Sequence, residues 1–243
     1  MRLETLKIDP RFCGPPDCGN GGYVAGRLAR HLPGSCEVSL RAPAPLDTPL
    51  EVHRVEDPGL ELRSGDLLIA RARPAELALE APPAPSYAEA EKRAGSCRAF
   101  ATHPFPGCFV CGPAREPGDG LRVLPGWFPE QQLAAAPWAP QGLPDGDERT
   151  DAVFVWAALD SPSSFPLLED PASVRLEPMV LGRLAARIER TPRPGEPCVV
   201  TAWTIGTEGK RGIAGSALWS QENELLAVAR ATWVSLARDP AGS

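Results

Sequence analysis

The stretch 20-NGGYVAGRLARHL-32 has the pattern of an amphipathic helix. Its apolar positions recur at the spacing of one helix face: Tyr23, Val24, Leu28 and Leu32. Asn20 is a good N-cap residue, and Pro33-Gly34 is a clear stop signal. Apolar runs of strand length follow at 37–41, 50–55, 60–63 and 67–73. The first part of the chain therefore predicts one helix followed by several strands.

The second part of the chain repeats this order of elements. After short runs at 121–124 and 132–136, the apolar segment 151-DAVFVWAAL-159 begins behind Thr150, which we take as its N-cap. It ends before Pro162, which cannot continue a helix beyond its first turn. Longer runs with the alternation of a sheet come next, at 180–190, 198–205, 213–220 and 225–236. A helix followed by antiparallel strands, twice, predicts an α+β architecture.

Two pairs of short segments indicate an internal repeat. The segment 66-DLLIARAR-73 parallels 224-ELLAVARA-231, and 46-LDTPLEV-52 parallels 194-PGEPCVV-200. The additional residues of the second half fall around 207–221. We therefore interpret the second half as a copy that keeps a hairpin which the first half has shortened.

A proline-rich segment separates the two halves. It contains 81-APPAP-85, then a charged, helix-permissive stretch at 87–98, and then 103-HPFPG-107. Such a composition is typical of a connection over the surface. We expect an N-terminal half at residues 1–80, a linker at 81–107 and a C-terminal half at 108–243.

Composition excludes several classes of function. The 243 residues are 43% hydrophobic and 23% charged, which allows a substantial core. The net charge of −6 argues against a nucleic-acid partner held by phosphate contacts. Apolar runs are too short to cross a membrane, and residues 1–10 have no apolar signal core. We therefore expect a cytoplasmic protein.

The cysteines favour free thiols over a disulfide framework. There are seven, an odd number, and a reducing compartment keeps thiols reduced. Cys108 and Cys111 have the spacing of a metal-binding pair, and Cys13, Cys18 or His103 could complete a zinc site. Because the chain has no second pair of this spacing, buried thiols acting as small hydrophobes are the preferred interpretation, and we expect no metal.

The beginning of the second half resembles a known family. Residues 108-CFVCG-112 and 118-GDGLRV-123 are similar to the CxxCG…GL opening of many hotdog-fold thioesterases of the phenylacetyl-CoA thioesterase type. The helix signature of that family is HGG followed by an acid, as in HGGxxxxxxD. The first half has Gly21 and Gly22, with Asn20 in place of the histidine and Ala29 in place of the acid. The second half has lost the glycines and has an acid, Asp160.

The resemblance implies a fused double hotdog: two antiparallel sheets, each wrapping a central helix, as a pseudo-dimer in one chain. Hotdog dimers of this type build a composite site from both subunits, so one intact pair of half-motifs is enough. Asn20, Gly21 and Gly22 from the first half and Asp160 from the second would form that pair. The implied activity is hydrolysis of an acyl-CoA substrate without a cofactor, and two chains could pair further as a homodimer.

The chemistry of these residues agrees with this interpretation. Amides at a helix start are unpaired and lie at the positive end of the helix dipole, so Gly21 and Gly22 could bind a thioester oxygen. Asn20 could cap the helix or bind the substrate. Asp160 follows an apolar helix, which should raise its pKa and suit it to act as a general base, or as a nucleophile. Of the serines that follow, Ser161, Ser163 and Ser164, we expect Ser164 to position the water.

Simpler interpretations stand beside these. Asn20 with its glycines is also an ordinary loop that enters a helix, and Asp160 is also an ordinary helix end. A second hypothesis for function is a non-catalytic protein that binds acyl-CoA, which loss of the usual histidine favours. A third is a purely structural, dimer-forming domain.

Overall fold

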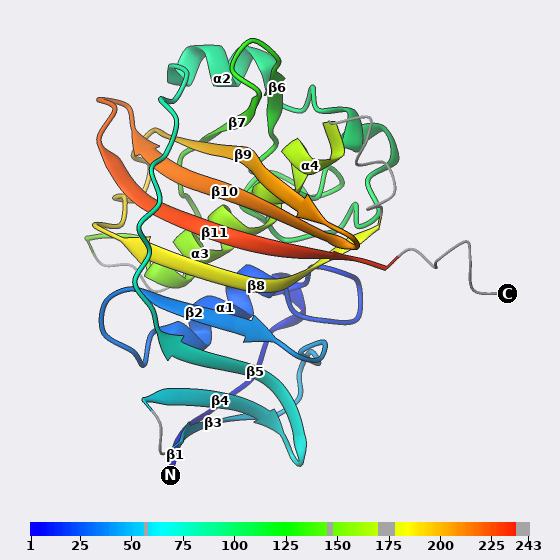
Figure 1. Ribbon diagram of the computed structural model, residues 1–243, viewed down its shortest axis with the longest axis vertical. Coiled ribbons are helices and arrows are strands. Elements are labelled where there is room, and N and C mark those ends of the chain that lie inside the picture. Colours follow the sequence, from blue (N-terminus) through cyan, green and yellow to red (C-terminus); the bar gives the residue numbers. More distant parts are fainter. Residues whose placement is uncertain (56–57, 145–147, 170–177, 237–243) are drawn as a thin grey trace, which may run out of the picture.

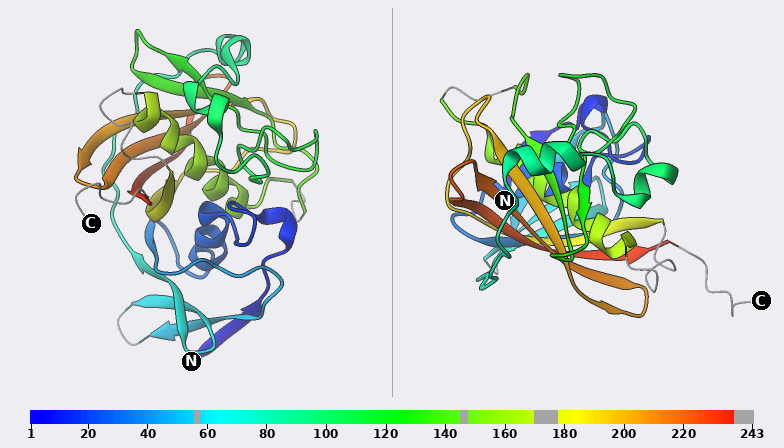
Figure 2. Two further views of the ribbon diagram at one scale, coloured as in Figure 1. Left: turned by 90° about the vertical axis from the view of Figure 1, so that its right-hand side faces the viewer. Right: turned by 90° about the horizontal axis from the view of Figure 1, so that it is seen from above.

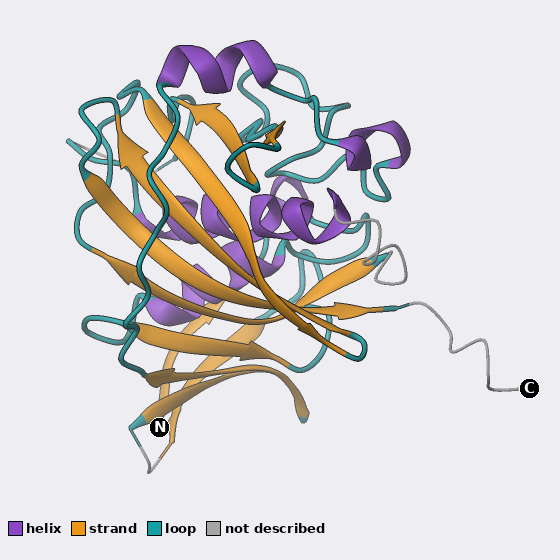
Figure 3. Cartoon of the chain, turned by 45° about the horizontal axis from the view of Figure 1, so that its top comes forward, coloured by secondary structure: helices purple, strands orange, loops and turns teal. Residues whose placement is uncertain are grey.

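The computed structural model describes residues 1–55, 58–144, 148–169 and 178–236. The strands in these residues form one antiparallel sheet of eleven strands in the order β1-β3-β4-β5-β2-β8-β11-β10-β9-β7-β6. Figure 1 shows the strands of the first half at one end of the sheet and those of the second half at the other. The main helices lie together on one side of this curved sheet (Figures 2 and 3).

The elements follow one another in two groups. The first comprises β1 (Arg2–Leu6), a 3-10 turn (Pro10–Phe12), α1 (Gly21–Ala29), β2 (Cys36–Leu40), β3 (Leu50–Val55), β4 (Gly59–Ser64) and β5 (Leu67–Pro74). A connecting region contains α2 (Tyr87–Arg93) and a 3-10 helix (Arg98–Thr102). The second group comprises β6 (Gly126–Phe128), β7 (Leu133–Trp138), α3 (Ala152–Asp160), a 3-10 helix (Ser161–Ser164), α4 (Phe165–Glu169), β8 (Met179–Ile188), β9 (Cys198–Glu208), β10 (Arg211–Ser220) and β11 (Leu225–Ser235).

The two halves share one sheet, which corrects the expectation of two separate sheets. β2 of the first half pairs with β8 of the second in antiparallel register, with Cys36 opposite Ala186 and Ser39 opposite Arg183. Unpaired edge strands expose backbone donors and acceptors, and this pairing satisfies both inner edges. The two halves of the sheet meet at the β2–β8 pairing. This places α1, from the first half, next to α3, from the second.

Most expected elements are present, with differences at their ends. The expected strand at 121–124 is absent from the sheet: the Leu121 and Val123 amides donate to the carbonyls of Phe109 and Val110 at 2.8 and 2.9 Å. This run is apolar because its Leu121 and Val123 side chains are buried in the core. The N-cap of α3 is Asp151, whose carboxylate accepts from the Val153 amide, and not Thr150. The short strands β1 and β6 and the short helix α4 were not predicted from the sequence.

The proline-rich segment after β5 crosses the outer face of the sheet on its way to α2 (Figure 1). The Arg187 guanidinium of β8 donates to the Leu77 carbonyl at 2.6 Å and ties the segment to the sheet. α2 then begins behind Ser86 with a capping box that includes Glu89. None of the helices in the described ranges is long and apolar enough to span a membrane.

α1 and α3 run antiparallel and touch through glycines. A Cβ atom on Gly22 would lie 2.4 Å from Cβ of Asp160 and 2.7 Å from the Trp156 carbonyl oxygen. A Cβ atom on Gly26 would lie 2.9 Å from Cα of Val153, one turn further along. The contact therefore requires glycine at both positions, and it brings the start of α1 against the end of α3.

Gly22→Ala is expected to destabilise the protein, because the added methyl group meets backbone atoms of α3 that cannot rotate away. Overpacking of this kind costs about 1–3 kcal/mol. Urea unfolding of the native chain and the variant measures this loss. Gly206→Ala in β9 is the matched control, since its added Cβ atom has no neighbour within 4 Å. An unchanged unfolding midpoint for Gly22→Ala would contradict the close packing of the two helices.

Candidate active site

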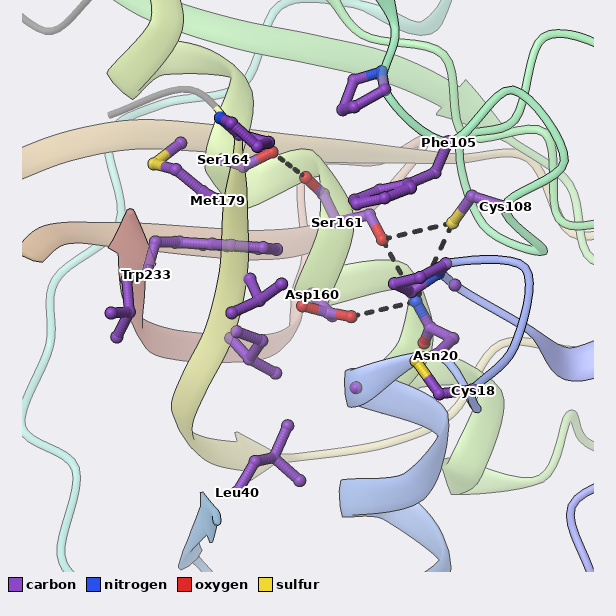
Figure 4. Close-up of a pocket in the computed structure, with 18 of the residues that line it drawn as sticks. Cys18, Asn20, Leu40, Phe105, Cys108, Asp160, Ser161, Ser164, Met179 and Trp233 are labelled. Carbon is purple, nitrogen blue, oxygen red and sulfur yellow. Dashed lines mark hydrogen bonds between the residues drawn. The ribbon is translucent and has the colours of Figure 1, made fainter. Parts of the chain in front are cut away.

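A cavity of about 840 Å³ opens where the start of α1 meets the end of α3. β8 and the last residues of β11 form one wall, and the segment around residues 99–111 forms another. Figure 4 shows Asn20, Ser161 and Cys108 gathered near Asp160, with Met179, Trp233 and Leu40 on the other side of this space. The residues most important for its shape and chemistry are Asn20, Gly21, Leu40, Phe105, Cys108, Asp160, Ser161, Phe165, Met179 and Trp233.

Asp160 is the buried acid of the cavity. It is the last residue of α3 and is only 1% exposed. Its Oδ2 atom accepts from the Gly22 amide at 2.8 Å and from Asn20 Nδ2 at 3.1 Å. Its Oδ1 atom is buried and has no hydrogen-bond partner within the described part of the chain. One carboxylate oxygen is therefore held by the first half of the chain, and the other is left free in the cavity wall.

The environment of Asp160 favours its protonated form. Burial raises the pKa of this carboxyl to about 7, and the nearby Cys108 sulfur adds to the effect. The hydrogen bonds from Gly22 and Asn20 act in the opposite direction and lower the pKa. The balance leaves a carboxyl that gains and loses its proton near neutral pH, as a general base requires.

Asn20 is fixed by contacts at both ends of its amide. Its Oδ1 atom accepts from the Tyr23 amide at 2.9 Å, which makes Asn20 the N-cap of α1. Its Nδ2 atom donates to Asp160 Oδ2 and, at 3.2 Å, to Ser161 Oγ. Because both N–H groups already have acceptors, the structure favours a role in holding Asp160 over direct binding of a substrate.

The two glycine amides differ, although the sequence suggested the same role for both. The Gly22 amide is occupied by Asp160, and Gly22 does not line the cavity. Gly21 does line it, and as the first residue of α1 it has an amide that the helix itself cannot satisfy. Of the two expected donors to a substrate oxygen, the structure leaves Gly21 available.

Comparison with solved structures identifies the fold. The chain is similar to a putative thioesterase from Novosphingobium aromaticivorans, with 14% identity, a TM-score of 0.61, and coverage of 96% of this chain and 95% of that one. It is also similar to a putative thioesterase II from Thermobifida fusca, with 16% identity, a TM-score of 0.61, and coverage of 96% and 92%. A conserved protein from Alicyclobacillus acidocaldarius, described as having a hotdog fold, matches with 12% identity, a TM-score of 0.51, and coverage of 98% and 97%.

The chain has the hotdog fold. This confirms, at the level of the fold, the resemblance suggested by the CxxCG segment and the two partial helix motifs. No protein-family model and no curated protein matches the sequence.

The serines after the hotdog helix α3 take different positions from the expected ones. Ser164 lines the cavity, but its hydroxyl donates to the Ser161 carbonyl at 2.8 Å. Ser161, which we did not single out, accepts from Asn20 and lies 3.8 Å from the Cys108 sulfur. Ser163 donates to the Asp160 carbonyl at 2.6 Å and accepts from Trp233. The only signal in the sequence for Ser161 is that it directly follows Asp160.

Two cysteines of the second half also line the hotdog cavity. Cys108 and Cys111 both line it, and His103 Nε2 lies 3.2 Å from the Cys111 sulfur. Cys13 instead lies against the Gly107 carbonyl and the Arg115 guanidinium. Within the residues that the structure describes, no three histidine, cysteine or acidic side chains are arranged to hold a metal ion.

The apolar walls of the cavity were not predicted from the sequence. Phe105 comes from the connecting region, Phe165 from α4 and Trp233 from β11. Residues so far apart in the chain share no periodicity, so only the folded arrangement brings them to one cavity.

Proposed function

We propose that this hotdog protein is an acyl-CoA thioesterase with one composite active site. The observation that carries the proposal is the Asp160 carboxylate: buried, titrating near neutral pH, with one oxygen free beside a largely apolar cavity. A cavity of about 840 Å³ is within the range of small-molecule sites, about 300–1,000 Å³.

The proposal treats the chain as a pseudo-dimer of residues 1–80 and 108–243, joined by the linker at 81–107. Asn20, Gly21 and Gly22 come from the first half and Asp160 from the second. A second composite site would lie at the opposite ends of α1 and α3. There, Ala29 stands where the helix motif of the first half would need an acid. One working site per chain follows from this division.

In the proposed reaction, Asp160 Oδ1 takes a proton from a water molecule, whose oxygen attacks the thioester carbonyl carbon. The Gly21 amide donates to the carbonyl oxygen as negative charge develops on it, an effect worth about 3 kcal/mol per donor. Collapse of the tetrahedral intermediate breaks the carbon–sulfur bond. The CoA thiolate then takes the proton from Asp160, and a carboxylic acid is released. If Asp160 instead attacks the carbonyl directly, an acylated Asp160 would be trapped by rapid quenching and detected by mass spectrometry.

Release of free CoA tests the proposal. The native chain would be given short, medium, long and aromatic acyl-CoAs, and we expect turnover of at least one of them. No turnover, with acyl-CoA raising the Tm, would replace the proposal with the binding protein considered above. Neither turnover nor a shift in Tm would reject both functions.

Asn20→Ser tests the role of the Asn20 amide. Serine is also a good N-cap, so α1 should keep its start, but the side chain is too short to reach Asp160. Because the lost hydrogen bond lowers the pKa of Asp160, we expect the midpoint of the pH–rate profile to move upward. Ser164→Ala is the matched control in the same cavity, and we expect its midpoint to stay unchanged. A midpoint that moves equally in both variants would contradict a specific role for Asn20.

A further inference from the structure

Cys108 and Cys111 form a pair of thiols in the wall of the cavity, and the proposed reaction does not use them. A tight turn brings them together: the Gly112 amide donates to the Cys108 carbonyl at 2.9 Å. A Cβ atom on Gly112 would lie 2.4 Å from that same oxygen, so the turn requires glycine. Both residues line the cavity, and the nearby Cys111 thiol lowers the pKa of Cys108.

Polar groups from both halves of the chain lie close to the Cys108 sulfur. Ser161 Oγ lies 3.8 Å from it and Asn20 Nδ2 lies 4.0 Å from it (Figure 4). The nearby backbone amides of Val110 and Cys111 also lower the pKa of this thiol. Because hydrogen bonds to an ion stabilise the charged form, this arrangement favours a thiolate at Cys108.

His103 extends this set of donors to Cys111. The Phe105 amide donates to His103 Nδ1 at 3.1 Å, which places the proton of a neutral imidazole on Nε2. Burial lowers the pKa of His103 and keeps the ring neutral. The Nε2–H group faces the Cys111 sulfur at 3.2 Å, where it stabilises negative charge when Cys111 loses its proton.

The buried thiols of Cys36 and Cys198 have different surroundings. The Cys111 thiol and the other donors lower the pKa of Cys108 to about 6, against the effect of burial. Burial raises the pKa of Cys36 to about 11 and that of Cys198 to about 12. Of these three buried thiols, Cys108 therefore loses its proton most readily.

We propose that Cys108 and Cys111 are a redox-reactive dithiol, which a small peroxide entering the cavity converts to an intramolecular disulfide. The Cys108 thiolate attacks one peroxide oxygen and forms a sulfenic acid, and the departing hydroxide takes up a proton to become water. The Cys111 sulfur then attacks the Cys108 sulfur and displaces a second water, which carries away the Cys111 proton. In total, two thiols and one hydrogen peroxide give one disulfide and two waters.

The disulfide would alter the site around Asp160. Bonding to Cys111 draws the Cys108 sulfur away from Ser161 and Asn20, and Asn20 holds Asp160. We expect thioesterase activity to fall at least about tenfold on oxidation and to return on reduction. This consequence rests on the proposed function, but formation of the disulfide does not.

Mass spectrometry of the full chain treated with hydrogen peroxide at pH 7 tests the dithiol. Trypsin cleaves after Arg98 and Arg115, and the fragment 99–115 contains Cys108 and Cys111 as its only cysteines. After free thiols are blocked with iodoacetamide, we expect this fragment to have lost two hydrogens and to carry no label. Dithiothreitol should restore labelling at both cysteines. Oxidation should be at least about tenfold faster than at Cys36 or Cys198.

Single substitutions sharpen this test. Cys111→Ser removes the second thiol, so Cys108 should stop at the sulfenic acid and react with dimedone. Cys36→Ser in β2 is the matched control, and its fragment 99–115 should form the disulfide as in the native chain. A fragment that stays fully labelled while Cys36 or Cys198 oxidises overturns the dithiol. A disulfide in a chain that hydrolyses no acyl-CoA would leave the dithiol standing and reject the thioesterase.

Discussion

Asp160→Asn is expected to lower kcat/KM for acyl-CoA hydrolysis by about 100- to 10,000-fold, the usual contribution of general acid–base catalysis. The asparagine oxygen can still accept from Gly22 and Asn20, as Oδ2 does in the native chain. The group at the position of Oδ1 becomes an amide that cannot take a proton from water. The substitution therefore removes the proposed chemistry and keeps the contact between the two halves. Steady-state release of CoA from the best substrate measures the loss.

The stability of Asp160→Asn provides the control. A carboxyl whose pKa rises from its usual value of about 3.9 to about 7 on folding binds its proton more tightly in the folded state. Stability then falls as the pH rises between these two values, and the full cost is present above about pH 7. Asparagine has no such cost, so the Tm of the variant at pH 8 should equal or exceed that of the native chain. Inactivity together with a strongly lowered Tm would point to misfolding, and full activity would remove Asp160 from the mechanism.

The second large effect is the dependence of activity on pH. Because Asp160 must lose its proton to act as a base, kcat/KM should rise with pH and level off above about 7. Below this value it should fall about tenfold per pH unit, so a change from pH 8 to pH 5 should cost about 100-fold.

Rates measured across this range, corrected for spontaneous hydrolysis of the thioester, give the midpoint. The residual activity of Asp160→Asn should lack this dependence, which makes that variant the control for titration of the substrate and of other groups. A midpoint near 4 would show that Asp160 is not the buried, proton-holding group that the structure describes.

Local patterns in the sequence predicted most of the secondary structure. The helix at 20–32 was identified from its apolar face and its stop signal, and the structure ends α1 slightly earlier, at Ala29. The strands β8 to β11 were identified as long runs of strand-like sequence, and residues 198–202 and 214–218 are buried on both faces of the sheet. Prediction failed at 121–124, where an apolar run is buried in a loop, since burial alone does not specify a strand.

For the site, the two partial helix motifs were enough to name Asn20, Gly21, Gly22 and Asp160 as candidates. The structure brings Asn20, Gly22 and Asp160 into direct contact. The sequence could not assign their separate tasks, because a hydrogen bond depends on where atoms lie after folding. The Gly22 amide donates to Asp160, whereas Gly21 lines the cavity.

By itself, the sequence determined helices α1 and α3, most strands and the polar residues proposed to carry the chemistry, because these depend on neighbours within a few positions. Tertiary structure decided the features that depend on contacts between residues far apart in the sequence. The β2–β8 pairing made one sheet from two halves, and the glycines of α1 let α3 approach closely enough for Gly22 to reach Asp160. The apolar sequence of α3 predicted a raised pKa for Asp160, and burial at the contact with α1 is its main cause.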